Sequence, residues 1–205
     1  MKATALTIAL TVATPAMADT YGKYEMPRYS VLMQDSAFEL RAYEPALMAE
    51  VTVKSSQSGA LRKGFQILAG YIFGGNTSAE SVAMTSPVAQ TASETIAMTS
   101  PVAQTGTDGL WTVSFMMPRA YTMDTLPAPK NDAIRFVMTE PEQRVAVRFS
   151  GLASNARMTA KEAELRRFAQ TQGFAVTGPA QYLYYDDPMT LPWNRRNEVT
   201  LPIND

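Results

Sequence analysis

One segment of the chain combines an apolar stripe with an excess of positive charge, a pattern that suits a ligand with an apolar body and carboxylates at its edge. The stripe recurs at helical spacing and consists of Leu61, Phe65, Leu68 and Ile72. The cations of the segment are Lys54, Arg62 and Lys63, and residues 51–79 contain no acidic side chain. The stripe would give contact area to an apolar plate, and Arg62 would give charge-assisted hydrogen bonds to its carboxylates. An ordinary core-facing helix with a solvated basic back is the alternative.

Metal ligands are scarce, because the 205-residue chain contains no cysteine and no histidine. These absences exclude disulfides, zinc–thiolate sites, thiol nucleophiles, Ser–His–Asp triads and imidazole ligands. Met84 and Met98 occupy equivalent positions in two copies of a short repeat, and a thioether can ligate iron. Packing in a core is the alternative for both. The aromatic side chains beside the last loop, which offer tyrosine oxygens or plain packing, are Tyr182, Tyr184, Tyr185 and Trp193.

Other catalytic and binding motifs are missing from the sequence. No G-x-S-x-G motif occurs, and Gly74-Gly75-Asn76 follows a predicted helix instead of opening one, so it is not a phosphate loop. Asp186 and Asp187 precede a proline and are expected to cap a turn, not to bind a metal. The formal net charge of −1 gives no electrostatic footprint for nucleic acid.

The first 18 residues have the features of a secretory signal peptide. Lys2 is followed by an apolar stretch over 3–13, which is too short to span a membrane, and the triplet Ala-Met-Ala at 16–18 provides a cleavage site. We expect cleavage between Ala18 and Asp19, which leaves residues 19–205 as one domain of ordinary size. The sequence therefore predicts an exported protein, most simply periplasmic, with no transmembrane segment.

Two helices and several strands are expected to position these side chains. Apolar spacing predicts helices over 55–73 and 155–172, the second ended by Gly173, although a capping box at Thr159 and Glu162 offers a later start. Alternation at period two predicts strands over 29–53, 109–118, 133–138, 143–151, 181–185 and 195–202, and the repeat at 78–105 predicts two more. Strands, helix and strands follow one another twice. This order indicates an α+β domain of two similar halves with a mostly antiparallel, curved sheet.

Six segments follow one another in an order that is typical of one family. They are Tyr43-Glu44-Pro45, the doubled Ala-Met-Thr-Ser-Pro-Val, and the runs Gly70 to Asn76, Trp111 to Pro118, Arg148 to Gly151 and Arg195 to Val199. Together they resemble the SOUL heme-binding protein family, from about Tyr29 to Pro202. The resemblance implies a pseudo-twofold α+β domain, similar to the effector-binding domains of gyrase-inhibitor-like proteins. Its distorted antiparallel sheet or barrel would carry two long helices.

The resemblance also implies heme or another tetrapyrrole as ligand, bound along the first helix with basic residues near the propionates. Leu61-Arg62 matches the Leu-Arg of animal members, and Phe65 takes the place of an apolar contact one turn further on. Together with the charged stripe, this gives as candidate binding residues Leu61, Arg62, Lys63, Phe65 and Leu68, with Met84 and Met98 as candidate iron ligands. The sequence departs from the family where Thr190 and Leu191 stand in place of a basic residue. The axial histidine proposed for one animal branch is absent, so binding without a protein ligand, or through Tyr or Met, is left.

Three functions fit these features. The first is a non-enzymatic periplasmic carrier or buffer for heme or a related tetrapyrrole. The second is an enzyme, a hydrolase or a tetrapyrrole-modifying activity, that uses a Glu and a Tyr in the same cleft. A buried Glu with a raised pKa beside a Tyr in a pocket would favour this second function. The third is a protein-interaction module with a vestigial ligand cleft.

Overall fold

The computed structural model describes residues 17–78 and 93–204. Its helices are α1 (Gln57–Ile72), α2 (Asn155–Gln172) and the short 3-10 helix η1 (Pro192–Asn194). Its strands are β1 (Met17–Tyr21), β2 (Tyr24–Asp35), β3 (Phe38–Tyr43), β4 (Leu47–Lys54), β5 (Asn76–Thr77), β6 (Val102–Thr107), β7 (Leu110–Met116), β8 (Ala128–Pro129), β9 (Ile134–Met138), β10 (Glu142–Phe149), β11 (Ala175–Val176), β12 (Gln181–Tyr184) and β13 (Asn197–Asn204). In this part of the chain, no helix is long and apolar enough to cross a membrane.

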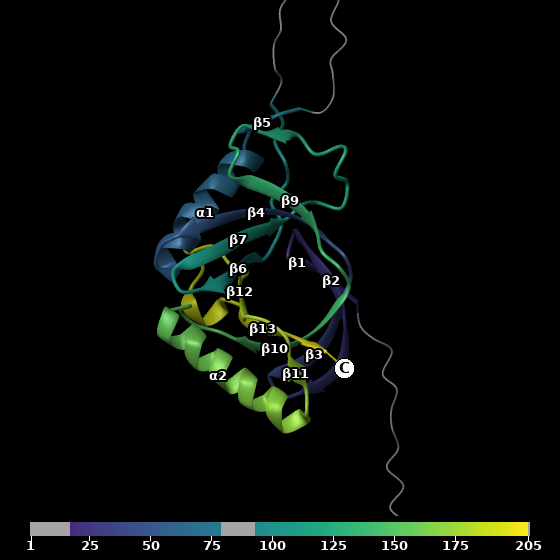
Figure 1. Cartoon of the computed structure of the whole chain (residues 1–205), viewed down its shortest axis with the longest axis vertical. Helices are drawn as coiled ribbons and strands as arrows, with labels where there is room; N and C mark the ends of the chain where they lie inside the picture. Colours follow the sequence, from purple (N-terminus) through teal and green to yellow (C-terminus); the bar gives the residue numbers. More distant parts are fainter. Residues whose placement is uncertain (1–16, 79–92, 205) are drawn as a thin grey trace, which may run out of the picture.

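A single curved sheet dominates the fold. Its strands pair antiparallel in the order β1-β2-β3-β10-β13-β12-β6-β7-β4-β9, and β11 adds to β13 beside this path. Figure 1 shows the sheet curling around with α1 and α2 on its outer side. The α+β class with a mostly antiparallel sheet is therefore confirmed, and the sheet is open, because β1 and β9 are its two ends.

The centre of the sheet has the pseudo-twofold arrangement that the sequence predicts. On one side of the centre β6 is followed by β7 and β4, and on the other side β12 is followed by β13 and β10. Helix α1 packs on β4 and β7, and α2 packs in the equivalent place on β10 and β13. The pseudo-axis thus passes between β6 and β12, in the gap that separates the two helices.

Both helices begin at serine caps and end near their predicted limits. The hydroxyl of Ser56 accepts a hydrogen bond from the backbone N–H of Gly59, and that of Ser154 accepts one from Arg157. Because Ser154 caps α2, the later start at Thr159 is not found. Gly173 ends α2 in the left-handed conformation, with φ of 79°, as a glycine cap does.

Small residues, more than the predicted apolar stripe, bring α1 onto the sheet. A Cβ on Gly64 would be 2.6 Å from Val113 of β7, so the helix backbone approaches the strand closely. The buried face of α1 therefore consists of Ala60, Gly64, Leu68, Tyr71 and Ile72. Leu68 and Ile72 of the stripe belong to this core, but Leu61 is half-buried and Phe65 is 38% exposed. Ala60 and Gly64 are too small to stand out in a hydrophobic pattern. The predicted stripe therefore includes Leu61 and Phe65 in place of these two residues, which belong to the true buried face.

The predicted strands are largely present, with one part outside the described residues. The first copy of the repeat, which includes Met84, falls mainly in 79–92. In the second copy, strand β6 begins only after Pro101, and Thr95 and Thr99 before it make isolated bridges. β1 begins at Met17, so the predicted cleavage site after Ala18 lies within this strand.

Candidate ligand-binding cleft

An apolar cleft of about 720 Å³ lies on the outer face of the sheet, between the two helices. Val102 of β6 and Tyr184 of β12, which are register partners, both line it. Figure 1 shows the N-terminal ends of α1 and α2 next to each other at this place. The volume is within the range of pockets that hold drug-sized ligands.

Helix α1 forms the first wall of the cleft through residues spaced at helical intervals. They are Ser58, Leu61, Arg62, Phe65 and Gln66. The ring of Phe65 stands edge-on to Phe115 of the core, with ring centroids 5.5 Å apart, so an exposed aromatic side chain is supported from below. The sequence-predicted residues Leu61, Arg62 and Phe65 are thus brought together on the cleft.

The second wall comes from two loops that are far from α1 in sequence. One contains Leu152, Ala153 and Ser154, which precede α2, and the other leads from β12 to β13. The second loop contributes Asp186, Asp187, Pro188 and Arg195 to the lining. The backbone N–H of Gly151 donates to the carbonyl of Pro192, at 2.9 Å, and ties the two loops together.

The charged groups of the cleft differ in whether they already have partners. Asp186 accepts hydrogen bonds from the Tyr21 hydroxyl and from the backbone N–H of Arg196. Asp187 caps a turn, as predicted, by accepting from the N–H of Met189. The guanidinium of Arg62, in contrast, has no hydrogen-bond or ion-pair partner among the described residues. An anionic group of a bound ligand can therefore pair with Arg62 without displacing a partner in the protein.

Both helices also begin at the cleft, which Ser58 of α1 and the cap Ser154 of α2 help to line. Neither helix has an acidic residue in its first turn. The positive ends of two helix dipoles therefore add to the charge of Arg62. The arrangement suits an apolar ligand whose negative groups lie toward the helix ends.

Three of the other predicted site residues lie away from this cleft, and one is not described. Leu68 is fully buried in the core beneath α1, and Lys63 is exposed but is not part of the lining. Met98 lies between the bridges that Thr95 and Thr99 make to other segments, and it does not line the cleft either. Met84 lies outside the described residues.

Sequence reasoning missed the residues that the loops contribute, above all Arg195. Its guanidinium donates to the backbone carbonyls of Thr190 and Pro188, at 2.7 and 2.5 Å. Arg195 belongs to one of the six segments that carry the family resemblance, and this was the available sign that it matters. No neighbouring residue in the sequence indicated that it would lie at the cleft. Thr190 and Leu191, where a basic residue was expected, belong to the same loop.

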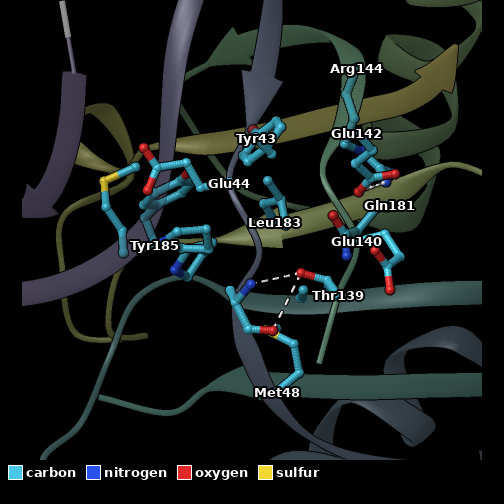
Figure 2. A pocket seen from close by; sticks show the side chains of 15 residues that line it. Tyr43, Glu44, Met48, Thr139, Glu140, Glu142, Arg144, Gln181, Leu183 and Tyr185 are labelled. Carbon is cyan, nitrogen blue, oxygen red and sulfur yellow. Dashed lines mark hydrogen bonds and ion pairs between the residues drawn. The ribbon is translucent and has the colours of Figure 1, made fainter. Parts of the chain in front are cut away.

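A second, much smaller cavity lies on the inner side of the sheet. Its volume is about 60 Å³, which leaves room for a few water molecules but not for a porphyrin-sized ligand. Figure 2 shows polar side chains around it, with Glu140, Glu142 and Gln181 on one side and Tyr185 and Glu44 on the other. Of these two cavities, the outer cleft is therefore the one with room for a tetrapyrrole.

A buried charge cluster lies near this inner cavity. Glu198 is fully buried and accepts hydrogen bonds from Arg41, Arg196 and the Tyr185 hydroxyl, at distances of 2.6–3.0 Å. Burial alone would raise the pKa of Glu198, but the two guanidinium groups outweigh it and lower this pKa below its usual range. This buried Glu beside a Tyr thus has the opposite shift from the one that an acid catalyst would need, so it is not the Glu that the enzymatic alternative requires.

Comparison with solved structures shows the same fold in proteins of different kinds. A hydrolase from Listeria innocua matches with a TM-score of 0.54 and 17% identity, over 84% of this chain and 94% of the other. The C-terminal domain of EcmrR matches with a TM-score of 0.55 and 12% identity, over 82% and 97% of the two chains. At these identities the likeness shows the fold alone.

Comparison with known sequences is more specific. Heme-binding protein 1 of Sus scrofa is 28% identical over 171 residues, which cover 82% of this chain and 85% of the relative. The family model of the SOUL heme-binding protein matches residues 24–202, which include every cleft residue named above. The chain therefore belongs to the SOUL heme-binding protein family.

Proposed function

We propose that the protein binds heme or a related tetrapyrrole in the outer cleft and acts as its carrier or buffer. One observation supports this above all: the cleft between the helices is large and apolar, and Arg62 lines it without a partner among the described residues. A tetrapyrrole with two propionates has the matching chemistry, because it is a flat apolar plate with negative charge at one edge. The family membership and the likeness to a heme-binding protein point the same way.

The residues present fit the porphyrin better than they fit its iron. Heme iron takes axial ligands, and the chain has neither histidine nor cysteine to offer. The hydroxyl of Tyr184 in the cleft donates to the side chain of Gln104, and burial raises the pKa of Tyr184, so this oxygen is held as a protonated phenol. Apolar contact with Leu61 and Phe65 and charge pairing with Arg62 would therefore supply most of the binding.

The proposed place of action is outside the cytoplasm. The basic start, the apolar stretch and the small-residue triplet at 16–18 support export, followed by release of a periplasmic protein. Weak or absent axial ligation would suit a carrier, because the ligand would leave without breaking a strong metal–protein bond.

Titration with hemin tests the proposal, with absorbance in the Soret region as the signal. The Ser58→Trp variant would fill the cleft from an exposed position on α1, and Thr159→Trp, at an exposed position of α2 outside the cleft, is the matched control. We expect saturable binding to the unmodified protein and to Thr159→Trp, and a loss of binding in Ser58→Trp. A hemin spectrum equal to that with an unrelated protein, or equal binding by both variants, would contradict binding in this cleft.

A further inference from the structure

The loop over 187–195, which closes one side of the cleft, has the reverse of the usual arrangement of polar and apolar side chains. Met189 is 89% exposed, Trp193 is 69% exposed and Leu191 is 53% exposed. Thr190, Pro192 and Arg195 of the same loop are half-buried, whereas Asn194 is exposed. Beside this apolar loop, Leu152 is 57% exposed. Scattered exposed apolar residues need no explanation, but three of them within one short loop are more than scatter. Met189, Leu191 and Trp193 are together called the ridge.

Hydrogen bonds hold the ridge in shape. Arg195 donates to the carbonyls of Pro188 and Thr190, and Asp187 accepts from the backbone N–H groups of Met189 and Thr190 through its side chain and carbonyl. The bond from Gly151 to Pro192 anchors the loop to the segment before α2. These hydrogen bonds hold the loop in the conformation that exposes its three apolar side chains.

Exposed cations lie near the ridge in a chain whose net charge is −1. Arg62 and Lys63 are exposed on α1, and Arg157 lies so close to Gly151 that a Cβ there would be 2.7 Å from its guanidinium. The carboxylates at this place are Asp187, which is exposed and caps the turn, and Asp186, which is half-buried and accepts from Tyr21 and Arg196. Exposed cations of α1 and α2 therefore lie near the ridge, and the carboxylates there are already hydrogen-bonded.

We propose that the apolar loop docks on an anionic lipid bilayer, with Met189, Leu191 and Trp193 in the headgroup region and the cations against phosphates. An exposed loop that carries a tryptophan and two other apolar side chains suits a membrane interface, whereas a groove would be needed to receive a peptide. Cations near an anionic surface add to the attraction of apolar side chains. This docking would place the mouth of the cleft at the bilayer, where an apolar ligand passes between lipid and protein without crossing water.

The test uses Trp193, one of only two tryptophans in the chain. The other, Trp111, packs against the core beneath both helices. The ligand-free protein is mixed with phosphatidylcholine vesicles that contain phosphatidylglycerol, and binding is measured by flotation. We expect co-flotation, a blue shift of tryptophan emission, and quenching by lipids brominated on the acyl chain. The Trp193→Phe variant should still float but lose the shift, which identifies the reporting residue.

A triple substitution, Met189→Ser with Leu191→Ser and Trp193→Ser, should weaken vesicle binding by about tenfold or more. The matched control is Leu110→Ser with Met123→Ser, which removes two apolar side chains that are 55% and 50% exposed elsewhere. Neither variant alters a residue that lines the cleft, so hemin titration without vesicles should be unchanged in both. High salt should weaken binding, because it screens the attraction of cations to headgroups.

Several results would overturn the proposal. One is that the protein does not float with the phosphatidylglycerol-containing vesicles. Another is that it floats without any change in Trp193 emission, and a third is that both variants lose binding equally. Self-association of the unmodified protein that the triple substitution abolishes would assign the ridge to a second copy of the chain instead. Because hemin binding is measured without lipid, failure of membrane docking and failure of the proposed function are separate outcomes.

Discussion

Val102 and Tyr184 are register partners across the antiparallel pair of β6 and β12, and both lie at the cleft between the helices. This pair lies at the pseudo-twofold axis, because the strands on either side repeat in the same order. A gap between two helices on the outer face of a sheet follows from that symmetry. The cleft is thus a product of the way the two halves join, and each half supplies one helix end to it.

The two tyrosines of β12 have different roles because one lies under α2 and the other lies in the cleft between the helices. Tyr182 and Tyr184 point to the same face of the strand, as alternate residues do. Tyr182 lies under α2, where its hydroxyl donates to Glu162, and is buried. Tyr184, two residues further along β12, is half-buried and lines the cleft. Only the second can touch a ligand.

The charge of Arg62 should contribute to binding of porphyrins with free carboxylates. In the Arg62→Ala variant we expect the affinity for hemin to fall about fivefold, which corresponds to about 1 kcal/mol for a partly exposed ion pair. The affinity for a porphyrin dimethyl ester should not change, because the ester has no negative charge to lose. Absorbance titration of both ligands measures the difference.

Lys63→Ala is the matched control for this prediction, since Lys63 is the adjacent exposed cation outside the cleft lining. It should have a smaller effect on hemin than Arg62→Ala. Equal losses for acid and ester in Arg62→Ala would show that the residue acts through packing and not through its charge.

Binding should depend little on the metal. Protoporphyrin without iron should bind within about threefold of hemin, a difference below about 1 kcal/mol, because the cleft offers no strong axial ligand. Competition between the two, followed by protoporphyrin fluorescence, measures the ratio. Hemin that bound more than tenfold tighter would reveal ligation by the protein, and loss of that advantage in Tyr184→Phe would locate the ligand.

The fold was largely predictable because its signals are local. Apolar spacing predicted the ends of both helices to within about two residues, and Gly173 predicted where α2 stops. The strands followed from alternation, but their order in the sheet did not, because β6–β12 pairing is a long-range contact without a local pattern. The pseudo-axis on which the cleft lies therefore became visible only in the structure.

The candidate site was predictable only where one helix supplies it. Leu61, Arg62 and Phe65 are neighbours on α1, so spacing and the family resemblance were sufficient. Leu68 was expected in the same set, but the closest approach of α1 to the sheet is at Gly64, which turns Leu68 into the core. Arg195 and Leu152 line the cleft from two different loops, and no periodic pattern in the sequence predicts that these loops lie side by side.

The buried ion pairs of Glu198 should make its charge important for stability. Glu198→Gln removes the buried carboxylate that pairs with both Arg41 and Arg196, and it leaves Arg41 only its pair with Glu39, so we expect the free energy of unfolding to fall by about 3 kcal/mol. Urea unfolding at neutral pH measures the change. Glu164→Gln, which breaks a partly exposed pair with Lys161, is the control and should cost about 0.5 kcal/mol. Equal effects would contradict a special role of the buried cluster.

Acid should remove the contribution of Glu198. Its pKa in the folded protein is lower than the ordinary value of 4.5, so its stabilisation is fully present above pH 4.5 and is lost as the pH falls through the lowered value. The difference in unfolding free energy between the unmodified protein and Glu198→Gln should be constant above pH 4.5 and shrink below it. A difference that stayed constant in acid would show that the charge of Glu198 is not its source.

Two glycines of α1 should respond to alanine in opposite directions. A Cβ on Gly64 would be 2.6 Å from Val113, so Gly64→Ala must push the helix off β7, and we expect a loss of about 1–3 kcal/mol in unfolding free energy. A Cβ on Gly70 of the same helix meets nothing within 4 Å, so Gly70→Ala should stabilise by about 0.5–1 kcal/mol through helix propensity alone. Urea unfolding of both variants compares them directly. The displaced helix in Gly64→Ala would also shift Leu61 and Phe65, so its hemin affinity should fall while that of Gly70→Ala stays unchanged. Two variants of equal stability would contradict the close contact that positions the first wall of the cleft.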